Sequence, residues 1–246
     1  MDRLIYTAMT GAKHILEQQS TVANNLANVT TSGFRAQIDS FRAVPVISEG
    51  LPTRTFVVDA TVGTNFESGV IHQTGNPMDV AVHGKGWIAV QLADGTEAYT
   101  RSGNLKLDEN GQLQTQSGLS VMGDGGPITV PPDTELAIAK DGTVSGISRN
   151  TTPNIVTALG RLKLVNPAEA ELVRGADGLF RSQDGNPFEV DENVVVVGGA
   201  IESSNVNMAE AMVNMITLAR NFELHMNLLK NAESNADRAN QILSLG

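Results

Sequence analysis

Apolar residues in the C-terminal part of the chain recur with the spacing of a helix–helix seam. The positions of this seam are Met208, Met212, Met215, Ala219, Phe222, Met226, Leu229, Ala232, Ala236, Ala239 and Leu243. The steps between them are mostly alternating fours and threes, and they average about 3.5 residues, which is the repeat of a coiled coil. The pattern predicts a long helix over residues 204–246 whose apolar stripe packs against another helix.

The beginning of the chain carries a similar pattern. Its positions are Leu4, Ala8, Gly11, Ile15, Val22, Leu26 and Val29, with Gln18 as a polar interruption. Asp2 is a suitable N-cap, and the Thr-Thr-Ser-Gly sequence at 30–33 ends the pattern. We therefore expect a helix over residues 1–30. Two amphipathic helices at opposite ends of one chain indicate an assembly protein rather than an enzyme.

The residues that follow the first helix have the composition of β structure. Prolines and short β-branched runs predict an extended connecting segment over residues 31–74. Turn dipeptides then recur at Asp94-Gly95, Asn110-Gly111, Asp124-Gly125 and Asp141-Gly142. Because such dipeptides favour hairpin turns, residues 75–175 are predicted to form an outer, hairpin-rich antiparallel β domain.

A return segment over residues 176–203 is predicted to lead back to the C-terminal helix. It contains a continuous valine run at 194–197, which predicts a strand buried on both faces. The predicted fold class is therefore α+β. Long N- and C-terminal helices form a coiled-coil-like assembly domain, and an antiparallel β domain is inserted between them.

The distribution of charge separates the ends of the chain from its middle. The net charge of the whole chain is −10. Residues 1–74 carry six acidic and five basic side chains, and residues 204–246 carry four and three, so each end has a net charge of −1. Residues 75–203 carry 17 acidic and nine basic side chains, a net charge of −8. The nearly neutral ends can be packed together, whereas the acidic middle favours solvent, and no basic patch indicates nucleic acid.

The sequence offers no convincing catalytic, cofactor or metal site. It has no cysteine, and its four histidines are scattered without metal-ligand spacing. His14 and His225 are expected on the polar faces of the helices. Gly84-Lys85-Gly86 and Asp108-Glu109-Asn110-Gly111 are better explained as turns than as a dinucleotide loop or a calcium loop. We therefore expect no enzyme activity, no cofactor, no metal and, without a long apolar run or a typical signal peptide, no membrane insertion.

Four separated blocks resemble the family of flagellar rod and hook proteins. They are Ala23-Asn24-Asn25-Leu26-Ala27-Asn28-Val29-Thr30-Thr31-Ser32-Gly33-Phe34, Thr74-Gly75-Asn76-Pro77-Met78-Asp79 with Gly84-Lys85-Gly86-Trp87, Tyr99-Thr100-Arg101-Ser102-Gly103-Asn104, and Glu202-Ser203-Ser204-Asn205-Val206-Asn207. Within the family, the segments Phe34-Arg35-Ala36-Gln37 and Gly160-Arg161-Leu162-Lys163-Leu164-Val165 favour a proximal rod subunit. The short interval between Phe34 and Phe66 favours it over a distal rod protein, which stays as an alternative.

The resemblance implies a structural subunit of the proximal rod, part of the drive shaft that transmits torque from motor to hook. It also implies contacts with copies of the chain and with other rod subunits, passage through the flagellar export apparatus without a cleaved signal peptide, and a place in the periplasmic part of the basal body. A secreted carbohydrate-binding or adhesive β protein is a weaker alternative, because one Trp and two Tyr offer little to line a sugar cleft. The assembly interface is expected at Leu4, Ala8, Ile15, Val22, Asn24, Asn25, Leu26, Asn28, Phe34, Asn205, Asn207, Met208, Met212, Met215, Ala219, Phe222, Met226, Leu229 and Leu243.

Overall fold

The computed structural model describes residues 2–45, 55–148 and 156–244, with the backbone alone at some positions in helices and strands. The chain divides into two compact units. Unit 1 consists of Met1–Asn28, Ala36–Asn65 and Val206–Gly246, and unit 2 of Val29–Arg35 and Phe66–Asn205. The chain therefore passes from one unit to the other four times.

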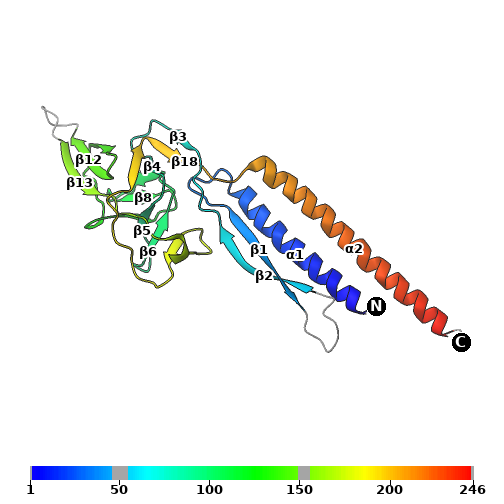
Figure 1. Ribbon diagram of the computed structural model, residues 1–246. Helices are drawn as coiled ribbons and strands as arrows, with labels where there is room; N and C mark the ends of the chain where they lie inside the picture. The colour runs from blue at the N-terminus through cyan, green and yellow to red at the C-terminus, as the bar shows by residue number, and fades with distance from the viewer. Residues whose placement is uncertain (1, 46–54, 149–155, 245–246) are drawn as a thin grey trace. The chain divides into compact units, whose positions relative to one another are not determined.

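Unit 1 is built from two helices and one hairpin. Its elements are α1 (Asp2–Ala27), β1 (Gln37–Pro45), β2 (Thr55–Thr64) and α2 (Met208–Ser244). The two helices lie side by side, and the β1–β2 hairpin packs against α1 (Figure 1). Helices are thus present at both ends of the chain, as the apolar spacing predicts. The segment expected to be merely extended forms paired strands, with Gln37 opposite Thr64 and a bulge at Ser40/Phe41.

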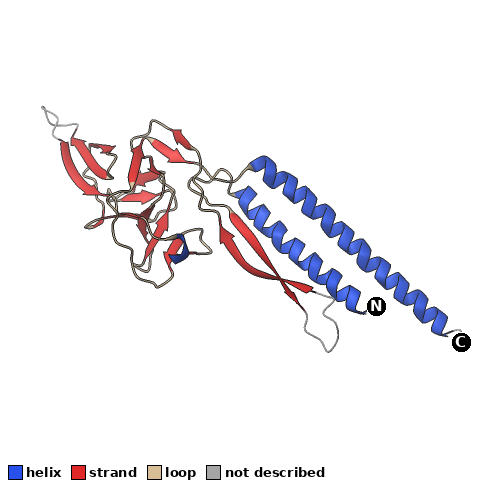
Figure 2. Ribbon diagram, viewed as in Figure 1, coloured by secondary structure: helices blue, strands red, loops and turns tan. Residues whose placement is uncertain are grey.

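Unit 2 is almost entirely antiparallel β structure (Figure 2). Its strands are β3 (Ile71–Gln73), β4 (Val80–His83), β5 (Trp87–Gln91), β6 (Glu97–Thr100), β7 (Leu105–Leu107), β8 (Leu113–Thr115), β9 (Ser120–Gly123), β10 (Gly126–Pro127), β11 (Thr134–Ile138), β12 (Thr143–Ser148), β13 (Val156–Arg161), β14 (Leu164–Val165), β15 (Leu172–Arg174), β16 (Phe180–Ser182), β17 (Val195–Gly198) and β18 (Ala200–Glu202). One 3-10 turn, η1 (Glu169–Glu171), precedes β15. Together with the helices of unit 1, these strands confirm the α+β class.

The pairing of the strands joins distant parts of unit 2. The largest sheet has the order β15-β16-β6-β5-β9-β8-β7, with β10 added to β9 and β14 added to β5. Strands β11, β12 and β13 form a second sheet in sequence order. Two small sheets pair the return segment with the first strands of the unit, β17 with β4 and β18 with β3. Strands near the beginning of unit 2 therefore pair with strands near its end.

Each of the four predicted turn dipeptides lies between two consecutive strands that pair with each other. Gly95, Gly111 and Gly142 have φ values of 84°, 77° and 83°, which glycine adopts without a steric penalty. At Asp124-Gly125 the positive φ falls one residue later, on Gly126. The Asp108 carboxylate accepts the backbone N–H of Asn110 at 2.9 Å, as in an Asx turn, and this confirms the turn reading of that sequence.

The prediction for the valine run is wrong in one respect. Val194 and Val196 are buried, but Val195 is 41% exposed. Strand β17 pairs with β4, and its residues alternate between a covered and an open face, as in a sheet with one face packed on the core. A continuous apolar run was therefore not sufficient to indicate burial on both faces.

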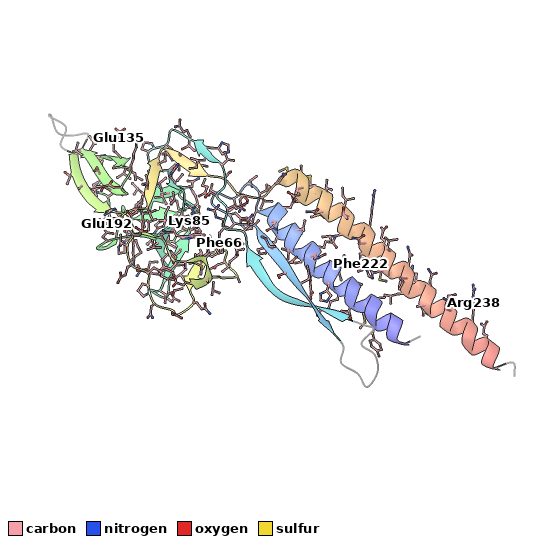
Figure 3. The ribbon with its side chains drawn as sticks, viewed as in Figure 1. Phe66, Lys85, Glu135, Glu192, Phe222 and Arg238 are labelled. Atoms are coloured by element: carbon pink, nitrogen blue, oxygen red, sulfur yellow. The ribbon has the colours of Figure 1, made fainter. Side chains whose placement is uncertain are left out.

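Two apolar clusters form the core of unit 2. The larger cluster is aliphatic and is contributed by β4, β5, β7, β8, β9 and β12, among other elements. The smaller cluster surrounds Trp87, the single tryptophan of the chain, and contains Tyr99 and Phe180. The Trp87 and Phe180 ring centroids are 4.5 Å apart. Phe66, labelled in Figure 3, and Phe188 also pack against this cluster, which therefore holds five of the ten Phe, Tyr and Trp residues of the chain.

The Tyr99 hydroxyl is buried in this aromatic cluster. It accepts the backbone N–H of Phe188 at 2.9 Å and lies 3.2 Å from a Glu97 carboxylate oxygen. Burial raises the pKa of Tyr99 to about 12, and the Glu97 charge adds to this increase. A raised pKa in the folded state contributes stability that is fully present below the unfolded value of about 10 and is lost as the pH rises through 12.

We predict that Tyr99→Phe reduces the loss of stability of unit 2 between pH 10 and pH 12 by about 1 to 2 kcal/mol, because Phe cannot ionise. Chemical denaturation followed by Trp87 fluorescence at several alkaline pH values measures this. Tyr6→Phe is the matched control, because Tyr6 is the other tyrosine of the chain and is 57% exposed. An alkaline profile of Tyr99→Phe identical to that of the wild type would contradict the prediction.

Candidate functional site

The helix pair of unit 1 contains most of the residues that the sequence assigns to assembly. On α1, Ala8 and Ile15 are buried, and Val22 and Leu26 are partly buried. On α2, Met215, Phe222 and Leu229 are partly buried, between the buried residues Ala211 and Ala232. Phe222 lies midway along α2 (Figure 3). The side chains of Leu4 and Leu243 lie outside the described part of the structure.

The two helices come close to each other at a glycine. A methyl group added at Gly11 would lie 2.6 Å from His225 Cε1, well inside van der Waals contact. His225 Nδ1 is buried and makes no hydrogen bond within the described residues. The expectation that His225 occupies a polar face is therefore wrong, since its ring lies against α1 where Gly11 leaves room for it. His14 also does more than face solvent, because its ring packs edge-on against Phe41 at 5.9 Å.

The predicted C-terminal seam divides between two faces of α2. Among the positions of α2 whose side chains are described, the buried or partly buried ones are Ala211, Met215, Leu218, Phe222, His225, Leu229 and Ala232. The side chains of the seam positions Ala236 and Ala239 lie outside the described part. Met208, Met212 and Met226 are 45%, 46% and 38% exposed, and Ala219 is exposed too. At about 100° per residue, Met212, Ala219 and Met226 share one face that is rotated away from the first. Apolar residues of both faces fit a period of 3.5 residues, so the sequence prediction assigned residues of both faces to one seam.

Asn207 supplies the N-cap of α2. Its Oδ1 accepts the backbone N–H groups of Ala209 at 3.1 Å and Glu210 at 3.3 Å, which have no partner inside the helix. Glu210 lies in the first turn, where the helix dipole favours a negative charge. The sequence placed Asn207 at an interface, and the structure gives it this additional role within the chain.

Asn25 joins α1 to the hairpin. Its Nδ2 donates to the Gln37 carbonyl at 2.9 Å, and its Oδ1 accepts the Gln37 N–H at 2.8 Å. The amide therefore pairs with the backbone at the start of β1 as a neighbouring strand would. Thr21 adds a second link, because its hydroxyl lies 2.7 Å from Asp39 Oδ1. Asn24 is exposed, and Asn28 Nδ2 donates to the Asn24 carbonyl at the end of α1.

The remaining predicted residues, Phe34 and Asn205, belong to unit 2 and lie beside a buried cluster of charges. Glu202 Oε1 is 2.7 Å from Arg35 Nη1, and Glu202 Oε2 is 3.5 Å from Arg101 Nη1. The side chains of Arg35 and Glu202 are fully buried, and that of Arg101 is 3% exposed. We call these three residues the Arg–Glu cluster. Each of the three lies in a different segment that resembles the family, and the sequence pattern did not predict that they meet.

The Arg–Glu cluster carries a net positive charge in a region without water contact. Burial lowers the pKa of Arg101 to about 10, Glu202 opposes this decrease and Arg35 adds to it. The guanidinium carbons of Arg35 and Arg101 lie 6.0 Å and 5.6 Å from the Trp87 ring centroid, close enough for cation–π attraction. Arg101 also donates to the carbonyls of Val82 and Gly84. Its charge is thus balanced by a carboxylate, an aromatic ring and backbone dipoles.

Phe34 and Asn205 connect this cluster to the surrounding backbone. Arg174 stacks over Phe34 at 4.6 Å and donates to the Arg35 carbonyl at 2.6 Å. The Asn205 backbone N–H donates to the Phe34 carbonyl at 3.3 Å, and its Nδ2 donates to the Glu67 carbonyl at 2.9 Å. Two sequence blocks that resemble family signatures, one near each end of the chain, therefore meet here.

The described residues offer little that resembles a catalytic or binding centre. Among them, no group of three or more His, Asp or Glu side chains is arranged to hold a metal ion. Neither described helix has the length and apolar character that a membrane span requires. The features that stand out are the helix pair, the second apolar face of α2 and the Arg–Glu cluster.

Comparison with known proteins assigns three segments of the chain to family descriptions. Residues 5–35 match "Flagella basal body rod protein", residues 81–146 match "Flagellar hook protein FlgE/F/G D1 domain", and residues 197–242 match "Flagellar basal body rod FlgEFG protein C-terminal". The first match contains most of α1 and also Arg35, the second lies within unit 2, and the third contains Glu202 and most of α2.

Curated relatives match along the whole chain. The flagellar basal-body rod protein FlgF of Escherichia coli strain K12 is 46% identical, and that of Salmonella typhimurium strain LT2 is 45% identical, each over 100% of both chains. The flagellar basal-body rod protein FlgG of Buchnera aphidicola subsp. Schizaphis graminum is 30% identical over 97% of this chain and 98% of its own. The similarity is thus higher to these two FlgF proteins than to this FlgG protein.

We predict that the effect of Gly11→Ala changes sign with the residue at 225. In the wild type the new methyl group displaces the His225 ring and should destabilise the helix pair by about 1 to 2 kcal/mol. In a His225→Ala background it should stabilise by up to about 1 kcal/mol, because alanine is the better helix former. Thermal unfolding followed by helical circular dichroism gives the double-mutant cycle. Ser20→Ala, on the exposed side of α1, should have the same effect in both backgrounds, and additivity of Gly11 with His225 would refute the contact.

We predict that Asn25→Ala destabilises unit 1 by about 1 to 3 kcal/mol, because it leaves the Gln37 N–H and carbonyl without the Asn25 amide. Thermal unfolding of the purified chain measures the change. The neighbouring exposed Asn24→Ala is the matched control and should stay within about 0.5 kcal/mol of the wild type. Equal effects of the two substitutions would contradict the role of Asn25 in holding the hairpin.

Proposed function

This chain belongs to the family of flagellar basal-body rod proteins and is a structural subunit of the bacterial flagellar rod, and from that premise we propose that its helices are the elements by which it assembles. The 46% and 45% identities to FlgF relatives favour a proximal rod subunit over a distal one. Family membership leaves no support for a secreted carbohydrate-binding protein. The role in the rod is to form part of the drive shaft that carries torque from motor to hook.

The observation that carries this proposal is the second apolar face of α2. Among the described elements of unit 1, α1 is the one that packs extensively against α2. Met208, Met212 and Ile216 are nevertheless 45%, 46% and 57% exposed, and the face continues at Ala219 and Met226. A soluble helix that needed a single partner would carry polar residues at such positions. The second face is therefore suited to helices of neighbouring rod subunits.

Helix α1 has a smaller exposed apolar face of the same kind. Met9 and Leu16 are 54% and 50% exposed, and they share one side of the helix because they are seven residues apart. Methionine side chains are flexible and polarizable, so they can pack against neighbours that are not identical. This suits a rod in which a subunit meets copies of itself and other rod proteins. A coiled-coil-like packing of the two helices, continued between subunits, is the arrangement that we propose.

The interface that we propose contains the residues assigned to it by sequence, divided by role. Ala8, Ile15, Met215, Phe222 and Leu229 hold α1 and α2 together within a subunit. Met208, Met212, Ala219 and Met226 face other subunits. In this assignment the nearly neutral terminal segments form the assembly domain of the rod, and the acidic β unit, which carries most of the net charge of −10, projects outward.

Other parts of the proposal follow from family membership. The subunit has no enzyme activity, passes through the flagellar export apparatus on its way to the rod, and lies in the periplasmic section of the basal body. The exposed apolar faces of the helices suit an assembly role, and such a role does not require a pair of acidic and basic groups with shifted pKa values in a cleft.

We predict that Met212→Glu prevents rod assembly without unfolding the subunit. The substitution places a charge on the second face of α2, where partner helices would have to bury it, but solvates it in the free chain. Complementation of a strain that lacks its own proximal rod protein, scored by motility, measures assembly, and thermal unfolding should change by less than about 0.5 kcal/mol.

Two control variants separate the faces of α2. Met215→Ala removes a side chain from the α1–α2 contact and should destabilise the subunit itself by about 1 to 3 kcal/mol. Thr217→Glu places the same charge at an exposed position on the side of α2 opposite to Met226, and should complement. Full motility of Met212→Glu, or equal loss in Thr217→Glu, would overturn the assignment of the second face.

A further inference from the structure

The chain enters and leaves unit 2 through short segments that meet at one place. The crossings lie after residues 28, 35, 65 and 205. Residues 29–35 therefore form a loop of unit 2 that is tied to unit 1 at both of its ends, and the segments beginning at Phe66 and ending at Asn205 supply the other two connections. These segments are the covalent connections through which a force on the helices can reach the β unit.

Glu202 lies in the segment that ends at Asn205, and it forms polar contacts with the loop 29–35 and with the segment that begins at Phe66. Its carbonyl accepts the Gly33 N–H at 2.8 Å, and its carboxylate accepts the Gly69 N–H at 2.8 Å as well as lying 2.7 Å from Arg35. One residue thus contacts the loop 29–35 through main chain and side chain, and the entering segment through Gly69. A buried carboxylate that accepts a backbone N–H and pairs with a guanidinium is held far more strongly than an exposed one.

The backbones at this place are packed too closely for ordinary side chains. A methyl group at Gly69 would lie 1.9 Å from the Ser203 carbonyl oxygen, and one at Gly33 would lie 2.3 Å from the Arg101 carbonyl carbon. Gly33 also has a φ of 69°, which is the left-handed region that favours glycine. The Asn205 side-chain amide adds a further link between two of these segments, because it donates to the Glu67 carbonyl at 2.9 Å. The segment that ends at Asn205 is therefore in direct contact with each of the other two connecting segments.

Arg101 anchors these segments to the sheet. It follows β6, donates to the Val82 carbonyl at 3.1 Å and lies 3.5 Å from Glu202 Oε2. Trp87, at the start of β5, is next to both Arg35 and Arg101. The cluster is thus continuous with the largest sheet of unit 2, and a load on the connecting segments reaches that sheet through charged and aromatic contacts.

We propose that the Arg–Glu cluster is a buried clamp that fixes all the connections between the two units to the β sheet, so that torque passes between the helices and the β unit instead of being absorbed by loose linkers. A single connecting strand can swivel about its bonds, whereas several strands fixed to one another cannot rotate independently. Glu202 is the central residue because it joins Arg35, Gly33, Gly69 and Arg101. The mechanical part of this inference rests on the proposed function, but the fixing of the segments does not.

Hydrogen exchange in the purified full-length chain tests the clamp directly. Glu202→Gln keeps the shape of the side chain and removes the charge that pairs with two arginines. The amides of Gly33 and Gly69 should exchange at least about tenfold faster than in the wild type, while amides of the β11–β12 hairpin stay unchanged. Trp87 fluorescence should shift as well, since both arginines adjoin its ring. Unchanged exchange at Gly33 and Gly69, or an equal increase throughout unit 2, would overturn the clamp.

Two further variants keep the test decisive if Glu202→Gln folds poorly. Arg35→Lys preserves the charge but not the planar contact with Trp87, and should raise exchange at the same amides by a smaller factor. Glu169→Gln is the matched control, because Glu169 pairs with Lys85 at 3.8 Å while 58% exposed, and it should change neither amide. Equal exchange in Arg35→Lys and the wild type would also count against the clamp.

A motility assay under load tests the mechanical part. Cells that contain Glu202→Gln as their sole copy should assemble rods, because the helices are untouched, but their swimming speed should fall more steeply with medium viscosity than that of wild-type cells. A viscosity dependence like that of the wild type would overturn the mechanical role even if the clamp exists. Failure of the wild-type chain itself to restore rods would instead refute the proposed function.

Discussion

The buried carboxylate of Glu202 is the interaction on which the rest of unit 2 depends. A charge removed from water is tolerated only where opposite charges and hydrogen-bond donors surround it, and here they come from segments more than 100 residues apart in sequence. Satisfying this one group therefore fixes the path of the chain at Gly33, Gly69 and Arg101 together. Apolar packing around Trp87 then stabilises a geometry that the charges have already selected.

The helix pair of unit 1 follows a different principle. Small residues set how closely the helices approach, as the Gly11–His225 contact illustrates, and apolar side chains cover what remains. This leaves α2 with more apolar surface than α1 can cover. A monomer pays for that exposure in solubility, while an assembling subunit needs it. Unit 2 therefore contains the buried apolar core, whereas unit 1 keeps apolar helix faces exposed.

Sequence alone predicted the elements better than their contacts. Terminal helices and turns at Gly95 and Gly111 followed from local spacing and composition, which depend on neighbours a few residues away. The seam of α2 was placed on a mixture of faces because two apolar stripes admit the same average period. The pairing of Arg35 with Glu202 could not be found, because the two residues are 167 positions apart in the sequence and no local rule specifies which buried charges meet.

The positions of the two helices in the chain have a consequence for how the subunit is made. Helix α2 is the last element in the sequence, and its partner α1 is the first. Synthesis from the N-terminus therefore produces every other element before the helix pair can close. A chain interrupted anywhere before residue 208 has an α1 without its mate and lacks the second apolar face altogether.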